Sequence, residues 1–148
     1  MNWSIFIRPL RLSDLASRVA KGETAKLSFL VLLKTFQRLG YFVTLENVPR
    51  CVVEHIGHYR GMLIVADTLA EYDESGTRRR HVAMIRKYLR VRSFDEAGQA
   101  LLASSIRLAA ARMEDLSDII NVAIEELVRA SFELPGFSTL HPRTWRTR

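Results

Sequence analysis

The chain has 148 residues, a length that fits one domain, and 48% hydrophobic residues supply a buried core, so intrinsic disorder is not expected. A single cysteine excludes an internal disulfide and points to a reducing, intracellular setting. The N-terminal sequence has no signal-peptide pattern, and no apolar run reaches the length of a transmembrane helix. We therefore expect no membrane partner.

The formal net charge is +6, from 22 basic and 16 acidic residues, and the excess lies in one segment. Residues 76–92 contain seven Arg and Lys residues and no acidic residue, whereas the rest of the chain carries 15 basic and 16 acidic residues. A nearly neutral chain with one strongly basic segment is typical of a protein that binds a polyanion.

The first elements predicted are two helices. Ser13 is predicted to cap a short helix over residues 14–20. Thr24 is predicted to cap the next helix, which runs to about Leu39 and ends at Gly40. Apolar residues cover most of the circumference of this second helix, so we expect it to be central and buried.

Three further elements precede residue 90. Pro49 is predicted to start a helix at its first position, with a core stripe formed by Val52, Ile56, Tyr59 and Leu63. A short acidic piece follows at about 68–72. Ser75, Gly76 and Thr77 then open a basic helix that runs to about Leu89.

Two long helices are predicted in the last third of the chain. Ser93 is predicted to cap a helix that ends near Met113, and a second helix spans about 115–130. The sequence Leu134–Pro135–Gly136 ends it, and Ser138 resembles a final N-cap. Because the sequence has no alternating apolar pattern, no hairpin dipeptide and no repeat, the predicted fold is all-α, a compact bundle of about six to seven helices.

The basic helix is the first candidate site. Val82, Ile85 and Leu89 form a narrow apolar stripe, and Arg78 lies near its edge. The other basic residues share one side of the helix, over roughly 120°; they are Arg79, Arg80, Arg86, Lys87 and Arg90. Such a face suits phosphate contacts or entry into the major groove of DNA.

The energetics and the alternatives bear on this interpretation. Three arginines in the first turn oppose the helix dipole, at about 0.3–1 kcal/mol each, and a bound phosphate would remove that conflict. The plainer alternative is a solvated surface helix whose arginines pair with the acidic helices. Binding to a membrane surface is disfavoured because the apolar stripe is narrow.

Other chemistries have weak support. Cys51, His55 and His58 share a helical stripe, but no second cluster supplies a fourth metal ligand, so we expect a buried cysteine, two partly exposed histidines and no metal. The tetrapeptide His55–Ile56–Gly57–His58 also occurs in class I aminoacyl-tRNA synthetases, but no strand precedes it here. Nucleophile and phosphate-loop motifs are lacking. No cofactor, small-molecule substrate or enzymatic activity is expected.

The order and spacing of several segments point to a protein family. These segments are 32–42, 48–56, 72–73, 77–89, 92–94, 119–128 and 133–140. Together they resemble the N-terminal domain of the large replicative transposases of the Tn-three family. The resemblance covers roughly residues 24–140, and it rests on the whole series because no single motif is decisive.

This resemblance implies a helical domain that binds the terminal inverted repeats of a transposon, in the cytoplasm at the bacterial nucleoid. The family's catalytic domain, of RNase H type with acidic residues and magnesium, has no counterpart in these residues, so we expect DNA binding without catalysis. The transferred site residues are Arg78, His81, Arg86 and Lys87, and helical phase adds Arg79, Arg80 and Arg90.

The sequence departs from the family at two places. Arg90 stands where a family glycine closes the helix, and residues 141–148 do not continue the family's basic helix. We therefore expect an N-terminal segment over 1–23, a domain over 24–140 and a divergent basic tail, from a truncated or frameshifted transposase gene or an excised domain. The alternatives are a helical domain that associates with other transposase domains or with itself, and a remnant without function.

Overall fold

The computed structural model describes residues 12–59, 61 and 68–136. These residues form seven α-helices and one 3₁₀ helix, and their β-structure is limited to a single isolated bridge between Arg92 and Phe132. The prediction of an all-α fold with six to seven helices is confirmed. The chain divides after Leu89 into two compact units.

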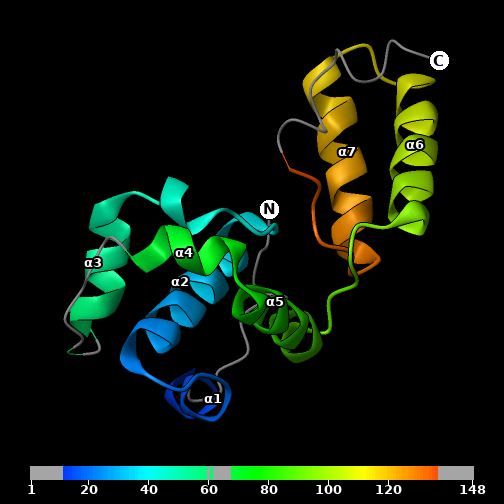
Figure 1. Ribbon diagram of the computed structural model, residues 1–148. Coiled ribbons are helices and arrows are strands. Elements are labelled where there is room, and N and C mark those ends of the chain that lie inside the picture. The colour runs from blue at the N-terminus through cyan, green and yellow to red at the C-terminus, as the bar shows by residue number, and fades with distance from the viewer. Residues whose placement is uncertain (1–11, 60, 62–67, 137–148) are drawn as a thin grey trace. The chain divides into compact units, whose positions relative to one another are not determined.

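The first unit is organised around one central helix, α2, which packs against α1, α3, α4, α5 and the short η2 (Figure 1). The elements of this unit are α1 (Leu12–Val19), α2 (Glu23–Leu39), η2 (Leu45–Asn47), α3 (Arg50–Tyr59), α4 (Thr68–Glu74) and α5 (Gly76–Leu89). The short acidic piece and the basic helix predicted from the sequence correspond to α4 and α5.

The helix α2 is buried around most of its circumference, as its sequence predicts. Phe29, Val31, Leu32, Leu33 and Phe36 are fully inaccessible to solvent, and together they form the core of the first unit. A helix that is apolar on all sides needs neighbours on all sides, and α2 has five.

The predicted C-terminal end of α2 is confirmed, whereas its predicted N-cap is wrong. Gly40 closes the helix in the left-handed conformation, with φ of 80°, and its N–H donates to the carbonyl of Phe36 at 2.7 Å. Thr24 is not the N-cap, because the helix begins at Glu23 and Gly22 precedes it without a side-chain hydrogen bond. Similarly, Ser13 lies inside α1 and does not cap it, because α1 begins at Leu12.

The predicted start of α3 and the first residue of its predicted core stripe are each wrong by one residue. The helix begins at Arg50, and the Pro49 carbonyl accepts the N–H groups of Val52 and Val53 at 2.9 and 3.3 Å, so Pro49 precedes the first turn. Val53 is buried and Val52 is exposed, because Val53 lies on the face that packs against α2. Leu63 lies outside the described residues.

The second unit is built on two helices that lie side by side, α6 (Glu96–Ala110) and α7 (Leu116–Arg129) (Figure 1). Their buried contacts are Leu102, Ala109, Ile119, Ala123 and Leu127. Both helices are capped by carboxylates. Asp95 accepts the N–H groups of Ala97 and Gly98, and Asp115 accepts those of Ser117 and Asp118.

The cap of α6 and its end correct the sequence prediction. Ser93 is not the N-cap, because the Asp95 carboxylate takes that role two residues later. The helix also ends at Ala110, three residues before Met113. For α7, the predicted span of about 115–130 is close to the observed one.

After α7 the chain returns to the residues that precede α6. The Arg92 N–H donates to the Ser131 carbonyl at 2.7 Å, and the Glu133 N–H donates to the Arg92 carbonyl at 2.8 Å. Gly98 lets the rings of Phe94 and Phe132 pack against α6, because a Cβ atom at residue 98 would lie 2.9 Å from the Phe94 ring and 3.2 Å from the Phe132 ring. Ser138 and the predicted tail over 141–148 lie outside the described residues.

Arg90 adopts the left-handed conformation, with φ of 57°, at the position where the family resemblance places a glycine. Because that conformation costs a non-glycine residue about 1–2 kcal/mol, Arg90→Gly is expected to stabilise the protein by about 0.5–1 kcal/mol after the added chain entropy is counted. Urea denaturation measures the change. Ala111→Gly is the matched control: its φ of −74° suits alanine, so no gain is expected there. A lower unfolding midpoint for Arg90→Gly would contradict this expectation.

Candidate nucleic-acid interface

The basic helix α5 begins at a serine cap. The Ser75 hydroxyl accepts the N–H of Arg78 at 3.1 Å and donates to the carbonyl of Tyr72 at 2.7 Å. Ser75 therefore both ends α4 and caps α5; the sequence predicts the second of these roles, because it places the opening of the basic helix at residues 75–77.

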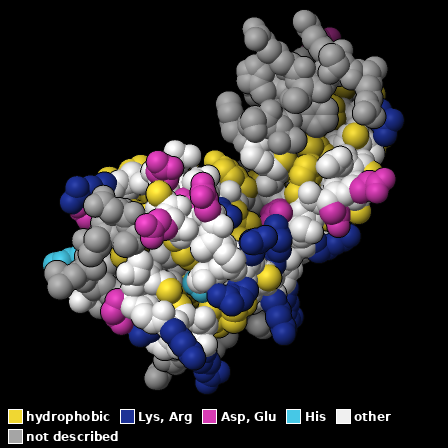
Figure 2. Space-filling model, in the orientation of Figure 1, with side chains coloured by type: hydrophobic (Ala, Val, Ile, Leu, Met, Phe, Trp, Pro, Cys, Tyr) yellow, Lys and Arg dark blue, Asp and Glu magenta, His cyan; other side chains and the backbone are white. Residues whose placement is uncertain are grey.

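Three predicted site residues on α5 are exposed, namely Arg79, Arg80 and Lys87. Arg80 donates to the hydroxyl of Thr77 at 3.0 Å. Arg86, beside them in helical phase, is half-buried and lies 5.4 Å from the ring centroid of Phe42. We call Arg79, Arg80, Arg86 and Lys87 the basic face. Figure 2 shows Lys and Arg side chains grouped over α5 and over α1.

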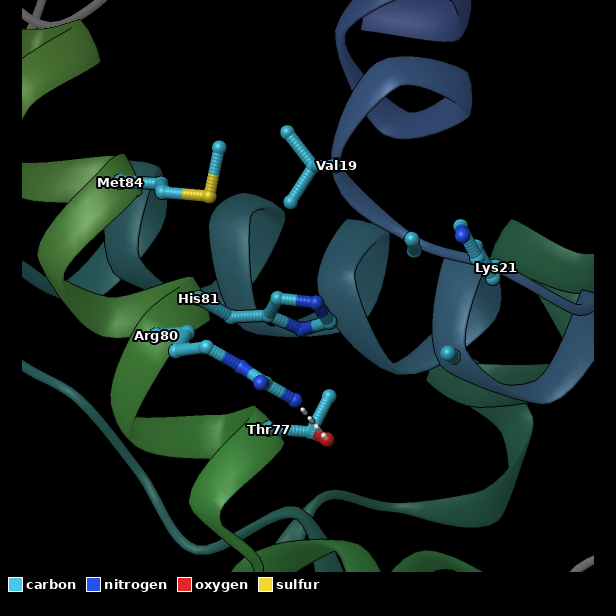
Figure 3. A pocket seen from close by; sticks show the side chains of 8 residues that line it. Val19, Lys21, Thr77, Arg80, His81 and Met84 are labelled. Atoms are coloured by element: carbon cyan, nitrogen blue, oxygen red, sulfur yellow. Dashed lines mark hydrogen bonds between the residues drawn. The ribbon is translucent and has the colours of Figure 1, made fainter.

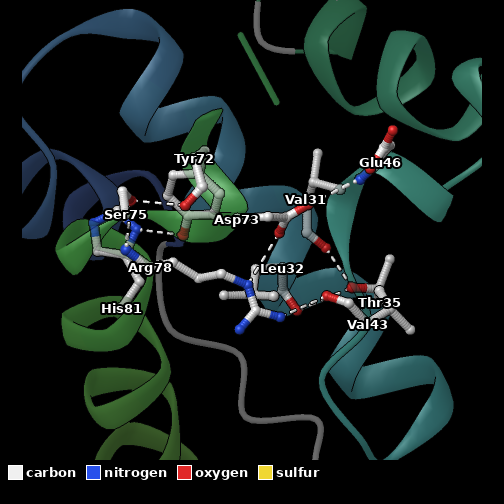
Figure 4. A network of polar contacts seen from close by, with 10 residues as sticks. All are labelled: Val31, Leu32, Thr35, Val43, Glu46, Tyr72, Asp73, Ser75, Arg78 and His81. Atoms are coloured by element: carbon white, nitrogen blue, oxygen red, sulfur yellow. Dashed lines mark hydrogen bonds and ion pairs between the residues drawn. The ribbon is translucent and has the colours of Figure 1, made fainter. Parts of the chain in front are cut away.

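Arg78 has a different environment from the basic face (Figure 4). Its Nε lies 3.0 Å from Asp73 Oδ1, and its Nη2 donates to the Val43 carbonyl at 2.8 Å. The side chains of Asp73 and Arg78 are 9% and 21% exposed. Asp73 also accepts the N–H of Glu46 at 3.0 Å. Arg78 therefore joins α5 to α4 and to the segment after α2, and it lies apart from the basic face.

The ion pair between Asp73 and Arg78 also reduces the electrostatic cost of placing three arginines in the first turn of α5. The basic segment contains no acidic residue, but Asp73 supplies a carboxylate from α4, five residues before Arg78. One of the three first-turn arginines is thus compensated within the protein. Arg79 and Arg80 remain exposed beside the N-terminal end of α5.

His81 lies in the core, so its prediction as a DNA contact is wrong. The residue is 2% exposed, and its ring packs edge-on against Phe29 with 5.1 Å between centroids. Its Nδ1 lies 2.7 Å from the Tyr72 hydroxyl. Burial, and secondarily the nearby Arg80 charge, lower the pKa of His81, and burial raises the pKa of Tyr72. The pair is therefore neutral at neutral pH.

A pH dependence follows from the lowered pKa of His81. In the unfolded chain the His81 imidazole binds a proton near pH 6.5, whereas in the folded protein it binds one only at a lower pH. Protonation of His81 therefore favours the unfolded state, and the free energy of unfolding should fall as the pH falls below about 6.5. We expect the free energy of unfolding, from urea titrations at pH 7.5 and 5, to fall less in His81→Gln than in the wild type. His55→Gln, on the exposed side of α3, is the control. An equal fall in the wild type and in His81→Gln would refute this role.

Arg90 is exposed, but it is not part of the helical face. The helix α5 ends at Leu89, and the left-handed φ of Arg90 turns the chain away from the helical path. The helical phase used to place it is therefore wrong, because the phase applies only within the helix. Arg90 begins the second unit.

The possible metal ligands on α3 do not form a site. Cys51, His55 and His58 are all exposed, which corrects the prediction of a buried cysteine. Within the described ranges, no three His, Cys, Asp or Glu side chains come together as metal ligands would. No described helix combines the length and the apolar character needed to cross a membrane.

A family model described as "Domain of unknown function (DUF4158)" matches residues 13–146. The chain belongs to the DUF4158 family. The match contains the segments on which the transposase resemblance rests, and it covers both units of this DUF4158 chain. No curated protein and no solved structure matches the sequence.

Helical phase agrees with the buried positions of Arg78 and His81 in this DUF4158 chain. At 100° per residue they lie about 20° and 40° from Ile85, at the centre of the buried side of α5. Only the family resemblance makes these two residues candidate DNA contacts. The remaining predicted residues of α5 are those that lie on the opposite side.

Proposed function

We propose that this DUF4158 domain is a DNA-binding module without catalytic activity of its own, which contributes to the recognition of transposon ends by a transposase. The observation that carries the proposal is the basic face of α5. The resemblance of residues 24–140 to the N-terminal domain of Tn-three family transposases supplies the kind of DNA. Such a module acts at the bacterial nucleoid, in the cytoplasm.

The charges of the basic face support phosphate binding. No carboxylate in the described part of the chain forms an ion pair with Arg79, Arg80 or Lys87. This finding disfavours the alternative in which these side chains pair with the acidic helices. Binding of exposed, clustered cations to DNA is favourable because they replace condensed counterions, which are released into solution.

The spacing along the helix also fits DNA. Arg80 and Lys87 are seven residues apart, which is roughly 10 Å along the axis. A duplex carries one negative charge per roughly 1.7 Å of its axis, so a face of this length can contact more than one phosphate. Arginine adds bidentate contacts to phosphate oxygens.

The test is binding of the full chain to a fluorescent transposon-end duplex and to a scrambled duplex, by gel shift and anisotropy at about 50 and 200 mM salt. We expect the logarithm of the binding constant to fall with the logarithm of salt concentration with a slope of about −3 to −4, for about four phosphate contacts. Tighter binding of the transposon-end duplex is expected as well. Undetectable or salt-insensitive binding would overturn the proposal.

A second candidate function is protein association, and a separate observation favours it. Three apolar side chains are exposed at the end of α6, the following turn and the start of α7: Leu108 at 67%, Met113 at 39% and Leu116 at 55%. Exposed apolar groups in one region often mark an interface. Sedimentation of the wild type and of Leu108→Lys tests it, because only a real interface would show concentration-dependent association that the charge abolishes.

A further inference from the structure

The first unit contains a pocket of about 470 Å³ between the end of α1, the start of α2 and α5 (Figure 3). This volume lies within the range of ligand-binding sites, about 300–1,000 Å³. Its polar side chains are Lys21, Thr77 and Arg80, and its apolar walls come from Val19, Ala25 and Met84. The pocket thus combines side chains from the α1–α2 turn with those from the basic helix.

The polar groups of the pocket favour an anion. Lys21 and Arg80 are both exposed and come from different elements, and within the described residues no carboxylate forms an ion pair with either. The nearby Glu23 is engaged by Lys26 at 3.2 Å. Thr77 accepts a hydrogen bond from Arg80 at 3.0 Å, which leaves its own hydroxyl hydrogen to donate to a ligand.

The apolar walls distinguish the ligand from a free inorganic anion. Val19 and Met84 lie together on one side of the pocket, while Lys21 lies on the other (Figure 3). An inorganic phosphate would satisfy the cations and leave the apolar walls wet, whereas a nucleotide unit offers a sugar that covers them. His81 also lines the pocket, but its lowered pKa keeps it uncharged at neutral pH.

We propose that this pocket receives one phosphodiester of the DNA backbone, with Lys21 and Arg80 on its phosphate oxygens, Thr77 donating to it, and the deoxyribose against Val19 and Met84. The inference rests on the proposed function and extends the interface from α5 to the α1–α2 turn. A phosphate held from two elements fixes the register of the domain on the duplex, because such contacts position a protein without reading sequence.

The experiment compares variants of the full chain by DNA anisotropy across a salt series. Lys21→Gln is expected to reduce the salt slope by about one unit and to weaken binding about fivefold at physiological salt. Lys34→Gln removes the same charge from an exposed position of α2 outside the pocket, and it is expected to leave the slope unchanged. Ala25→Phe fills the pocket without changing charge, and it is expected to weaken binding while circular dichroism shows an unchanged fold.

A neutral linkage in the DNA makes the test specific. A single methylphosphonate, moved along the duplex, should weaken the wild type most at one position, and at that position it should weaken Lys21→Gln less, because only Arg80 and Thr77 are then left to lose their contacts. Additive effects at every linkage would overturn the pocket. If inorganic phosphate, at ionic strength matched with chloride, raised the melting temperature of the wild type and not of Lys21→Gln, the ligand would be a free anion and the proposal would fail.

The two proposals fail in different ways. A wild type that does not bind DNA refutes both. A wild type that binds with the expected salt slope, together with Lys21→Gln and Ala25→Phe that both behave as Lys34→Gln does, refutes the pocket and leaves the proposed function intact.

Discussion

Replacing Arg79, Arg80 and Lys87 together by glutamine is expected to weaken DNA binding roughly a hundredfold at physiological salt and to reduce the salt slope by about three units. Each phosphate contact that is lost leaves about one counterion on the DNA, and the cost grows as salt falls. The three side chains are exposed, so the substitution leaves the core of the first unit unchanged. Anisotropy titrations over a salt series measure both quantities.

A matched control separates the basic face from net charge. Lys34, Arg38 and Arg112 are exposed, lie outside α5, and comprise the same one lysine and two arginines. Their joint replacement by glutamine changes the net charge equally, and we expect only a small loss of affinity from it. Equal losses for the two triple variants would show that overall charge, and not the face of α5, drives binding.

The sequence predicts those parts of the fold that depend on local pattern. The burial of α2 follows from apolar residues on all its sides, and the existence of α5 follows from its stripe and its serine cap. The N-cap of a helix is harder to predict where two residues near its start can both serve as the cap. Asp95 displaces Ser93 because its carboxylate reaches two backbone N–H groups at the start of α6.

The sequence predicts only part of the candidate site, because contacts with distant segments decide which side chains of α5 are exposed. The family resemblance makes Arg78 and His81 candidate DNA contacts, but their partners are Val43, Tyr72 and Asp73. The pocket joins Lys21 to Arg80, and the sequence between them gives no sign of that proximity. Charge pattern locates a basic helix, while tertiary contacts decide which of its charges face solvent.

Asp73→Ala is expected to have the largest effect on stability, lowering the free energy of unfolding by about 2–3 kcal/mol. The change removes the partner of the half-buried Arg78 and the acceptor of the Glu46 N–H. The cost is set below that of a fully buried pair because the Arg78 side chain is 21% exposed. Guanidinium denaturation, followed by circular dichroism, measures it.

A double-mutant cycle isolates the pair from its surroundings. Asp73→Ala combined with Arg78→Ala is expected to cost less than the sum of the single changes, because neither charge is then left without its partner. Asp73→Asn keeps an acceptor for the Glu46 N–H and should fall between Asp73→Ala and the wild type. Additive costs would show that the two side chains act independently.

The Asp73→Ala variant also distinguishes a role in stabilising the fold from a role in contacting DNA. Asp73 is nearly buried and lies away from the basic face, so its loss removes no phosphate contact. At a temperature where Asp73→Ala stays folded, its salt slope should therefore equal that of the wild type, although the protein is less stable. A reduced slope would mean that the ion pair with Asp73 is needed to set α5 for binding, and Arg78 would then belong to the interface through its effect on the helix.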